Sequence, residues 1–491
     1  MSNFPLATCR KIMKGKKIIL LLSAFSRQEM QAFGEFVRSP YFNKSPLLMD
    51  LVDYLSQEHP HIPSHTFEPQ HLPEHIFPDG QLSAKKLSYI LSDLQDLLEQ
   101  FLVIHRLQQK PYLRKYMYVN ALREHDLHGL YVTELKKLHD RLSEFDQYHR
   151  EALTIRYFVS DLHASVKHSK VADLENELQT AINHLYEFFL TNVLRYAYEG
   201  LNRQAIQFLQ ASQIPLLEQL EPLFTEYGEQ NPLIKLYHLL YVCAQKPQED
   251  EPFDQLRSLL SQKQHVLGTE QLRIIYFATI NLGLRKMRTK PQKYTQTTLD
   301  LYTEGIENGA LIEGNNLSQW TFSNTIKLAL RAQKYDWAEH FIENYQELLL
   351  KEQRSNALGL NLAELAFARE AFHDVLGHLN DVATTEVRYH ILVNTLKIKT
   401  LWELEEIQPA TAALLALKVY LSRTKRIAPP LRTAVQNFCQ MLHRIAIGGT
   451  ERKRLETREK IAQTKLLMDK PWLLKIFARE NPKLTAATQQ G

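Results

Sequence analysis

The chain has 491 residues, a formal net charge of +4 and only 16 glycines, where average usage would supply roughly 34. Tight hairpins and phosphate-binding loops need glycine for its positive φ or its missing Cβ, so this shortage argues against β-rich and nucleotide-binding folds. Hydrophobic residues at 44% and charged residues at 23% are near the globular norm, which excludes disorder, collagen and a bundle of membrane helices.

Three cysteines, Cys9, Cys243 and Cys439, lie far apart in the chain. Their spacing encodes neither a disulfide framework nor a thiolate zinc site. No apolar run approaches the roughly 18 residues of a membrane span. We therefore expect a cytoplasmic protein with no membrane span.

The charge is distributed unevenly. Residues 418–483 hold sixteen Lys and Arg but five Asp and Glu, and residues 1–17 hold five basic residues and no acid, which leaves −12 for residues 18–417. A basic end of this kind could steer an acidic partner or nucleic acid. The reading we favour is that it complements the chain's own acidic body, since pairs such as Glu456 and Lys460 have helical spacing.

The N-terminal region begins with a basic stretch and a short apolar run, which superficially resemble a signal peptide. The run leads directly into a capping box, Ser26-Arg-Gln-Glu29, so we assign it to the first packed element. A helix is predicted from Ser26 to Arg38, and Ser45-Pro46 starts a second. Apolar residues spaced by three and four between Leu87 and Ile104 predict a further helix. This stripe is either a coiled-coil seam or a core helix, and its width favours the core helix.

Between these helices, residues 59–80 carry five prolines and a group of histidines with nearby glutamates. Imidazoles and carboxylates are good ligands for zinc or nickel, but a proline-rich connector offers little frame to orient them. We favour a polar linker over a metal site and leave the choice open. The residues concerned are Glu58, His59, His61, His65, Glu68, His71, Glu74 and His75.

From Pro111 onward the periodicity predicts helix after helix with short polar joints. Helices are expected at Pro111–Glu124, Leu130–Glu144, Gln147–His168, Val171–Gln204, Pro215–Glu226 and Pro232–Gln245. The stretch from Gln245 to Pro252, rich in Gln, Glu, Asp and Pro, is a loop and the best internal boundary by composition.

The second half of the chain repeats itself. Residues 324–342 align with residues 361–379 at a constant offset of 37, and a looser third unit runs from Asn394 to Leu421. Asparagine, an aromatic residue, a small or β-branched residue and a large aliphatic residue recur at matching places. This recurrence is typical of stacked helix–turn–helix units.

The aromatic residue three positions before a small one, as in Tyr335-x-x-Ala338, resembles the turn into the second helix of a tetratricopeptide repeat. The family's Trp, Leu-Gly and Pro positions are mostly lost and the period exceeds 34, so its peptide-carboxylate clamp is not carried over. The whole chain also resembles uncharacterised bacterial helical-repeat proteins, a resemblance that implies no particular function. It rests on Leu22-Ser-Ala-Phe-Ser, Ser39-Pro-Tyr-Phe-Asn-Lys44, Leu301-Tyr-Thr-Glu-Gly-Ile-Glu-Asn-Gly309 and Asn316-Leu-Ser-x-Trp320.

The sequence contains no GxxxxGK[ST], GxGxxG, GxSxG or HExxH motif. We therefore expect no enzyme, no catalytic residues and no cofactor. The fold expected is an all-α solenoid of degenerate tetratricopeptide-like hairpins behind a small helical N-terminal unit. The expected function is a scaffold that binds a peptide or helix from an unidentified protein in a superhelical groove. The alternative is a regulator that contacts nucleic acid through the basic C-terminal region.

These expectations give a segment map of the chain. It comprises a basic extension at 1–17, a helical N-terminal unit at 18–110 with the connector 59–80, a helical-hairpin array at 111–246, tetratricopeptide-like repeats at 252–447, and a basic C-terminal cap and tail at 448–491.

Overall fold

The computed structural model describes residues 14–63, 65–67, 72, 76, 84–144, 150–166, 171–207, 214, 217–424 and 427–481. Within these residues there are 22 α-helices and one two-stranded sheet, which confirms the predicted all-α class. The chain divides into two compact units, one of Met1–Phe145 and Glu151–His184, the other of Asp146–Arg150 and Leu185–Gly491. Each unit is described by itself.

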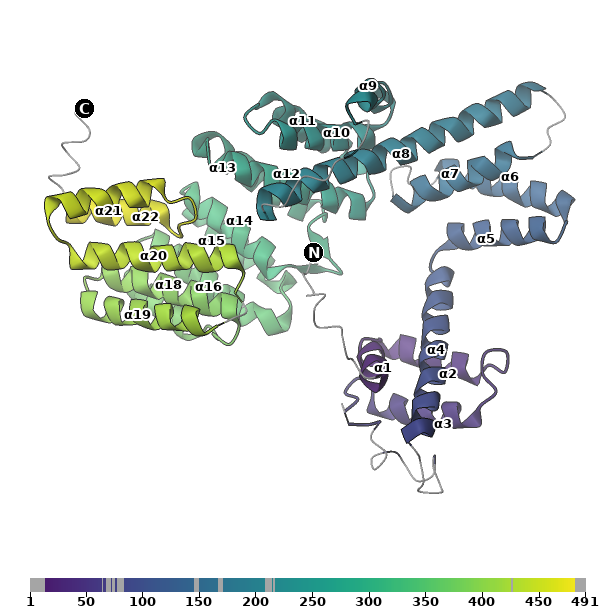
Figure 1. Ribbon diagram of the computed structural model, residues 1–491, viewed down its shortest axis with the longest axis horizontal. Helices are drawn as coiled ribbons and strands as arrows, with labels where there is room; N and C mark the ends of the chain where they lie inside the picture. Colours follow the sequence, from purple (N-terminus) through teal and green to yellow (C-terminus); the bar gives the residue numbers. More distant parts are fainter. Residues whose placement is uncertain are drawn as a thin grey trace. The chain divides into compact units, whose positions relative to one another are not determined.

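The first unit is built from helices (Figure 1). They are α1 (Lys14–Ser23), α2 (Arg27–Arg38), α3 (Pro46–Glu58), α4 (Ala84–Gln108), α5 (Pro111–Glu124), α6 (His128–Glu144), α7 (Arg150–Ala164) and the first part of α8 (Val171–Gln207), up to His184.

Helices α1 to α4 share one apolar core. The Ser26 hydroxyl accepts a hydrogen bond from the backbone N–H of Glu29, whose carboxylate accepts one from the Ser26 N–H, so the predicted capping box is confirmed. Pro46 occupies the first turn of α3, also as predicted. The apolar stripe of α4, from Leu87 to Phe101, is buried in this same core. Helix α4 is therefore a core helix of its own chain.

The second unit continues from α8 through fourteen more helices, α9 to α22. They are α9 (Glu221–Gln230), α10 (Pro232–Gln245), α11 (Glu251–Lys263), α12 (Thr269–Lys286), α13 (Pro291–Glu307), α14 (Gln319–Arg331), α15 (Tyr335–Tyr345), α16 (Lys351–Ala368), α17 (Phe372–Asn380), α18 (Val387–Glu403), α19 (Ile407–Arg423), α20 (Pro429–Ile447), α21 (Glu451–Gln463) and α22 (Lys470–Glu480).

Consecutive helices of this unit pack as hairpins: α10 on α11, α12 on α13, α14 on α15, α16 on α17 and α18 on α19. We call α10, α12, α14, α16, α18 and α20 the first helices and α11, α13, α15, α17 and α19 the second helices. First helices also pack on one another, α10 on α12, α14 on α16 and α16 on α18, whereas no successive second helices in the described chain pack to that extent. Neighbouring hairpins also meet through the second helix of one and the first helix of the next, as in α13 on α14, α17 on α18 and α19 on α20.

Three of the turns within these hairpins share one backbone conformation. Gln333, Glu370 and Glu405 adopt left-handed φ angles of 58°, 59° and 64° just after a first helix. In each turn the next residue donates its N–H to the carbonyl five residues earlier, at 2.9 Å, which satisfies an orphan carbonyl of the helix end. Gln333 and Glu370 stand 37 residues apart, at the offset of the sequence repeat. Asp126, after α5, has the same conformation with φ of 57°.

The sequence analysis missed a short hairpin between α13 and α14. Strands β1 (Ile312–Glu313) and β2 (Asn316–Leu317) pair antiparallel, with Ile312 opposite Leu317. Gly314 and Asn315 link them with φ of 55° and 65°, the pair of positive angles that a two-residue hairpin turn requires. Strands this short carry no alternating pattern that a sequence could reveal.

Candidate functional site

The first helices α14, α16 and α18 bring charged side chains together on one face. Lys327 Nζ lies 3.2 Å from Glu364 Oε1, and Lys399 Nζ lies 3.2 Å from Asp469 Oδ2. The four side chains surround a pocket of about 230 Å³. Its other lining residues are Leu330, Leu392, Thr395, Leu396 and Met468. We call this the polar pocket.

The carboxylate of Glu364 sits between two lysines. Burial would raise the pKa of Glu364, but the positive charges of Lys327 and Lys399 outweigh it, so the net pKa lies below the ordinary value for a glutamate. The carboxylate is therefore ionised at neutral pH. Because the side chain keeps 21% of its surface exposed, a ligand can reach it without unfolding the helices.

Lys399 is the most buried charge of the polar pocket, with 9% of its side chain exposed. Its ammonium lies 4.5 Å from the ring centre of Phe367 and 5.9 Å from that of Trp472. Asp469 and the two aromatic faces offset the cost of burying this cation. The pocket thus combines two ion pairs with apolar lining residues.

Helix α22 lies beside the polar pocket and covers part of the same face. Trp472 Nε1 donates to Glu403 Oε1 at 2.7 Å, and Arg479 Nη1 pairs with Glu403 Oε2 at 2.7 Å. Lys475 pairs with Glu370 at 3.3 Å. The apolar side of α22 is buried in one core with residues of α18 and α20. We call the covered surface the α22 seat: Phe367, Glu370, Ile398, Lys399, Glu403 and Phe438.

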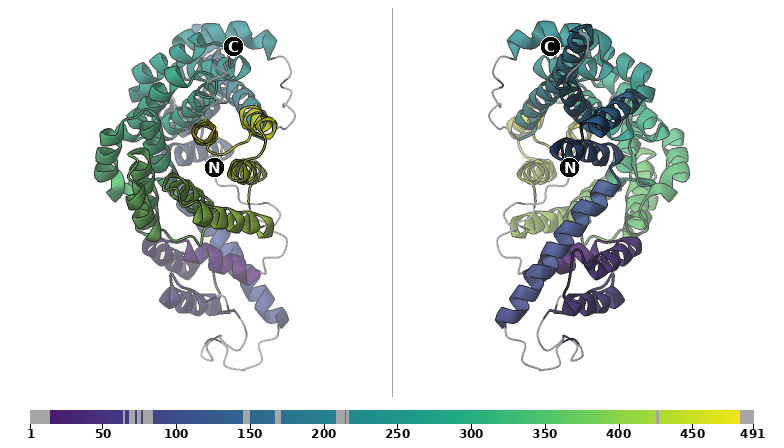
Figure 2. Two further views of the ribbon diagram at one scale, coloured as in Figure 1. Left: turned by 90° about the vertical axis from the view of Figure 1, so that its left-hand side faces the viewer. Right: turned by 90° about the vertical axis from the view of Figure 1, so that its right-hand side faces the viewer.

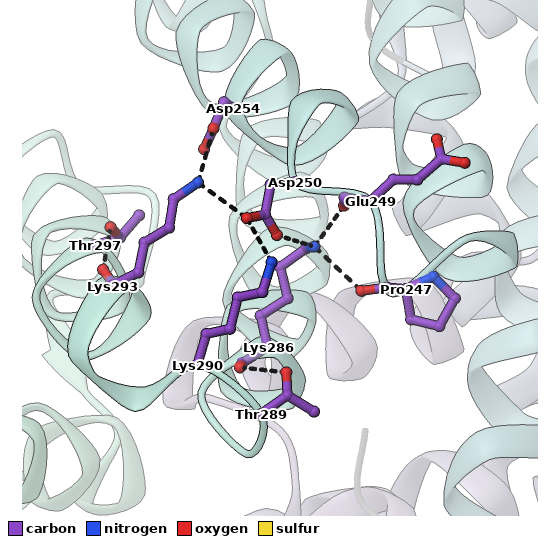
Figure 3. Close-up of polar contacts among 9 residues, drawn as sticks. All are labelled: Pro247, Glu249, Asp250, Asp254, Lys286, Thr289, Lys290, Lys293 and Thr297. Atoms are coloured by element: carbon purple, nitrogen blue, oxygen red, sulfur yellow. Dashed lines mark hydrogen bonds and ion pairs between the residues drawn. The ribbon is translucent and has the colours of Figure 1, made fainter.

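A second polar cluster joins α11, α12 and α13 (Figure 3). The Asp250 carboxylate accepts a hydrogen bond from Lys290 Nζ at 2.8 Å. It also accepts one each from Lys286 Nζ and Lys293 Nζ, both at 3.3 Å. The buried ammonium of Lys286 also donates to the carbonyls of Pro247 at 3.1 Å and Glu249 at 2.6 Å. We call this group the Asp250 corner.

Electrostatics mark the Asp250 corner as a structural tie. The hydrogen bond from Lys290 is the main reason that the pKa of Asp250 lies far below its usual range, and burial raises the pKa of neighbouring Tyr294 to about 12. Lys286 directs its bonds to acceptors of the connector before α11, so it holds that connector in place. The ionised side chains of the corner are paired with one another or with backbone carbonyls.

The first unit contains half-buried histidines on α6, α7 and α8. Ser160 Oγ lies 2.6 Å from His184 Nδ1, and burial lowers the pKa of His184 to about 4. His163 Nδ1 lies 2.7 Å from a Glu177 carboxylate oxygen, and its ring stacks on His139 with centres 4.9 Å apart. Ser160 is only 2% exposed, and its hydroxyl is the hydrogen-bond partner of the half-buried imidazole.

The histidine group predicted at 59–75 is described only in part. His59 Nε2 lies 2.9 Å from the carbonyl oxygen of Phe25, and His61 and His65 are exposed. His71 and His75, with Glu68 and Glu74, fall outside the described residues. Within the described ranges no three His, Cys, Asp or Glu side chains are placed to hold a metal ion. The linker and the metal site remain predictions.

Several side chains of the basic C-terminal region have partners within the protein. Arg432 donates to the carbonyls of Leu421 and Thr424 at the end of α19. Arg454 donates to the Gly449 carbonyl and to Asn481 Oδ1, each at 3.0 Å. Lys475 and Arg479 pair with acidic residues of the α22 seat. These contacts agree with a basic end that complements the acidic body, and the nucleic-acid alternative remains a prediction.

Two of the three cysteines lie within the described residues, and both are buried free thiols. Cys243 on α10 is 1% exposed and Cys439 on α20 is 2% exposed. Burial raises the pKa of each to about 12, so neither is a reactive thiolate at neutral pH. Cys9 lies outside the described residues.

The sequence analysis named no residue of the polar pocket. The sequence nevertheless contained a signal, because Lys327 and Glu364 are aligned with each other when the repeats are matched at their offset of 37 residues. Opposite charges at one repeat position indicate an ion pair between neighbouring first helices. Asp469 had no such signal, since it comes from a connector outside the repeats.

No helix in the described part of the chain is long and apolar enough to span a membrane. Comparison with known proteins gave no match to a family model, a curated protein or a solved structure.

Proposed function

We propose that the second unit is an α-solenoid of degenerate tetratricopeptide-like hairpins, and that the protein is an interaction scaffold. Its partner would bind as a peptide or helix across the first helices. The shared turn after α14, α16 and α18 and the packing of first helix on first helix support this proposal. In Figure 2 the teal and green helices of this unit follow one another in an arc, with the yellow C-terminal helices toward its inner side.

The polar pocket is the observation that carries the proposal. A peptide lying over α14, α16 and α18 would meet an ionised carboxylate at Glu364 and a cation at Lys327, both half-buried. Charge-assisted hydrogen bonds in such surroundings are stronger than those between neutral groups in water. A stack of hairpins places its first helices side by side, so an extended ligand can contact several of them at once.

The test is affinity capture from the native cell followed by mass spectrometry, with a charge-swapped variant as comparison. Lys327→Glu combined with Glu364→Lys keeps an ion pair between α14 and α16 but reverses its direction. We expect the partner captured by the natural chain to be lost with the swapped pair. Lys351→Glu, an exposed change on α16, should leave capture intact. The same partner captured equally by the swapped variant would count against the polar pocket as its site.

A further inference from the structure

We propose that the partner of this scaffold is a basic amphipathic helix that takes the place of α22 on the α22 seat. The inference rests on the proposed function and adds the chemistry of the ligand to it. Helix α22 already binds this surface within the chain, so its side chains show which chemistry the surface accepts.

The seat is apolar at its centre. Trp472, Leu473, Ile476 and Phe477 of α22 are each at most 8% exposed, and their spacing of one, three and one places them on one side of a helix. The Trp472 ring lies 6.1 Å from that of Phe438 on α20. An occupant therefore needs aromatic and aliphatic residues on one side at helical spacing.

The rim of the seat is acidic. Glu403, with 6% of its side chain exposed, accepts from both Trp472 and Arg479, and Glu370 pairs with Lys475. A buried carboxylate that lost these donors would be left without compensation. The occupant therefore needs basic residues beside its apolar side, together with a donor equivalent to the Trp472 indole N–H.

Helix α22 leaves part of the first-helix face uncovered. It begins at Lys470, and the chain enters it through Asp469, which has a left-handed φ of 48°. The polar pocket lies just beyond that end, where Met468 and Asp469 line it together with Lys327 and Glu364. A partner helix that extends further in this direction gains contacts with α14 and α16 that α22 does not make. These extra contacts allow a partner helix to displace α22. Helix α22 is tethered to the seat by its own chain, so its effective concentration there is on the order of millimolar.

The experiment uses a fluorescent peptide of residues 466–481 as the probe and the full chain as the receptor. In the natural chain α22 occupies the seat and should suppress binding of the probe. Trp472→Ala combined with Phe477→Ala should vacate the seat and tighten binding by at least about tenfold, measured by fluorescence anisotropy. Adding Glu403→Gln to this variant should weaken binding again by about tenfold.

A second variant guards against loss of folding. Arg479→Glu repels Glu403 without touching the apolar contacts, and it should also increase probe binding while the far-ultraviolet circular dichroism stays unchanged. Glu480→Gln, an exposed change on the same helix, should behave like the natural chain. Binding of the probe to none of these proteins, or equally to all of them, would overturn the proposal.

The outcome for this inference is separable from that of the proposed function. If the partner captured from cells is lost with the swapped Lys327 and Glu364 pair but is indifferent to Arg479→Glu and to competing probe, the scaffold stands and the helix-imitation inference fails. If the probe binds as expected but capture of the partner does not depend on the polar pocket, the α22 seat is supported as a helix-binding surface and the polar pocket is rejected as the partner's site.

Discussion

Two buried or half-buried polar groups in each unit make a contrast, although half-buried imidazoles also occur in the second unit, at His238 and His390. In the first unit they are imidazoles, with His184 held by Ser160 and His163 by Glu177. In the second unit they are ammonium groups, with Lys286 held by carbonyls and Asp250, and Lys399 by Asp469 and aromatic rings.

The difference lies in how each group avoids an unpaired buried charge. A histidine can become neutral close to physiological pH, so a hydroxyl is a sufficient partner. A lysine keeps its proton and needs carboxylates or several carbonyls. Around Lys286 and Lys399 the second unit should therefore be insensitive to mild acid and vulnerable to loss of a partner, whereas the first unit around His184 should show the opposite behaviour.

Loss of Lys286 should have the largest effect. Lys286→Met removes the donor shared by Pro247, Glu249 and Asp250, and we expect the free energy of unfolding to fall by about 3 kcal/mol. Lys290→Met, which removes a half-exposed partner of the same carboxylate, should cost at most about 1 kcal/mol. Urea denaturation of both variants measures the difference. Equal losses would show that Lys286 is not the tie of the Asp250 corner.

Acid should weaken the first unit next. Burial lowers the pKa of His184 to about 4 and also lowers the pKa of His139. The neutral imidazole is favoured in the folded state, so the stabilisation is complete above the unfolded pKa of about 6.5 and is lost as the pH falls toward 4. We expect a loss of about 2 kcal/mol between pH 7.5 and pH 5.

Hydrogen exchange measured at both pH values, and corrected for intrinsic rates, can assign this loss to a unit. Protection of α7 should fall while that of α16 stays constant. His184→Gln should flatten most of the dependence. A loss of protection centred on the second unit would break the contrast between the two interiors.

The shared turns should give a smaller effect. Gln333 holds a left-handed φ of 58°, which glycine adopts without strain. Gln333→Gly should therefore stabilise the chain by about 0.5 kcal/mol, whereas Lys334→Gly, at a φ of −94°, should destabilise it. Thermal denaturation with both variants distinguishes the two signs. Destabilisation by Gln333→Gly would mean that its side chain matters more than its backbone.

The smallest effect is expected from nucleic acid. Because many C-terminal basic groups have internal partners, protein purified at low salt should retain no nucleic acid, as judged by its absorbance ratio at 260 and 280 nm. If nucleic acid is retained, and retention falls steeply with salt and with Arg452→Glu and Lys453→Glu, the nucleic-acid alternative replaces the scaffold.

Local signals made much of the helical framework predictable. Pro111 and Pro232 mark the first residues of α5 and α10 as expected, because proline is tolerated only where its missing N–H costs nothing. The capping box at Ser26 likewise starts α2 as expected. These features depend on neighbours within a few residues, which the sequence displays directly.

The candidate site was much less predictable. Its charges lie 35 or more residues apart in the chain, and periodicity within one helix does not say which neighbour its polar side meets. The seating of Trp472 against Glu403 depends on how the last helix returns to α18, a long-range contact with no pattern in the intervening chain. Only the alignment of repeats carried part of this information, in the pairing of Lys327 with Glu364.

The alkylation rates of the two buried thiols can be used to measure local opening of the second unit. Cys243 lies beside Lys286 at the Asp250 corner, and Cys439 belongs to the core that Trp472 completes. Each can be alkylated only when its surroundings open, so the two reaction rates time two separate local events. Release of α22 by a competing helix would accelerate labelling of Cys439 and leave that of Cys243 unchanged, which makes occupancy of the seat measurable without any added probe.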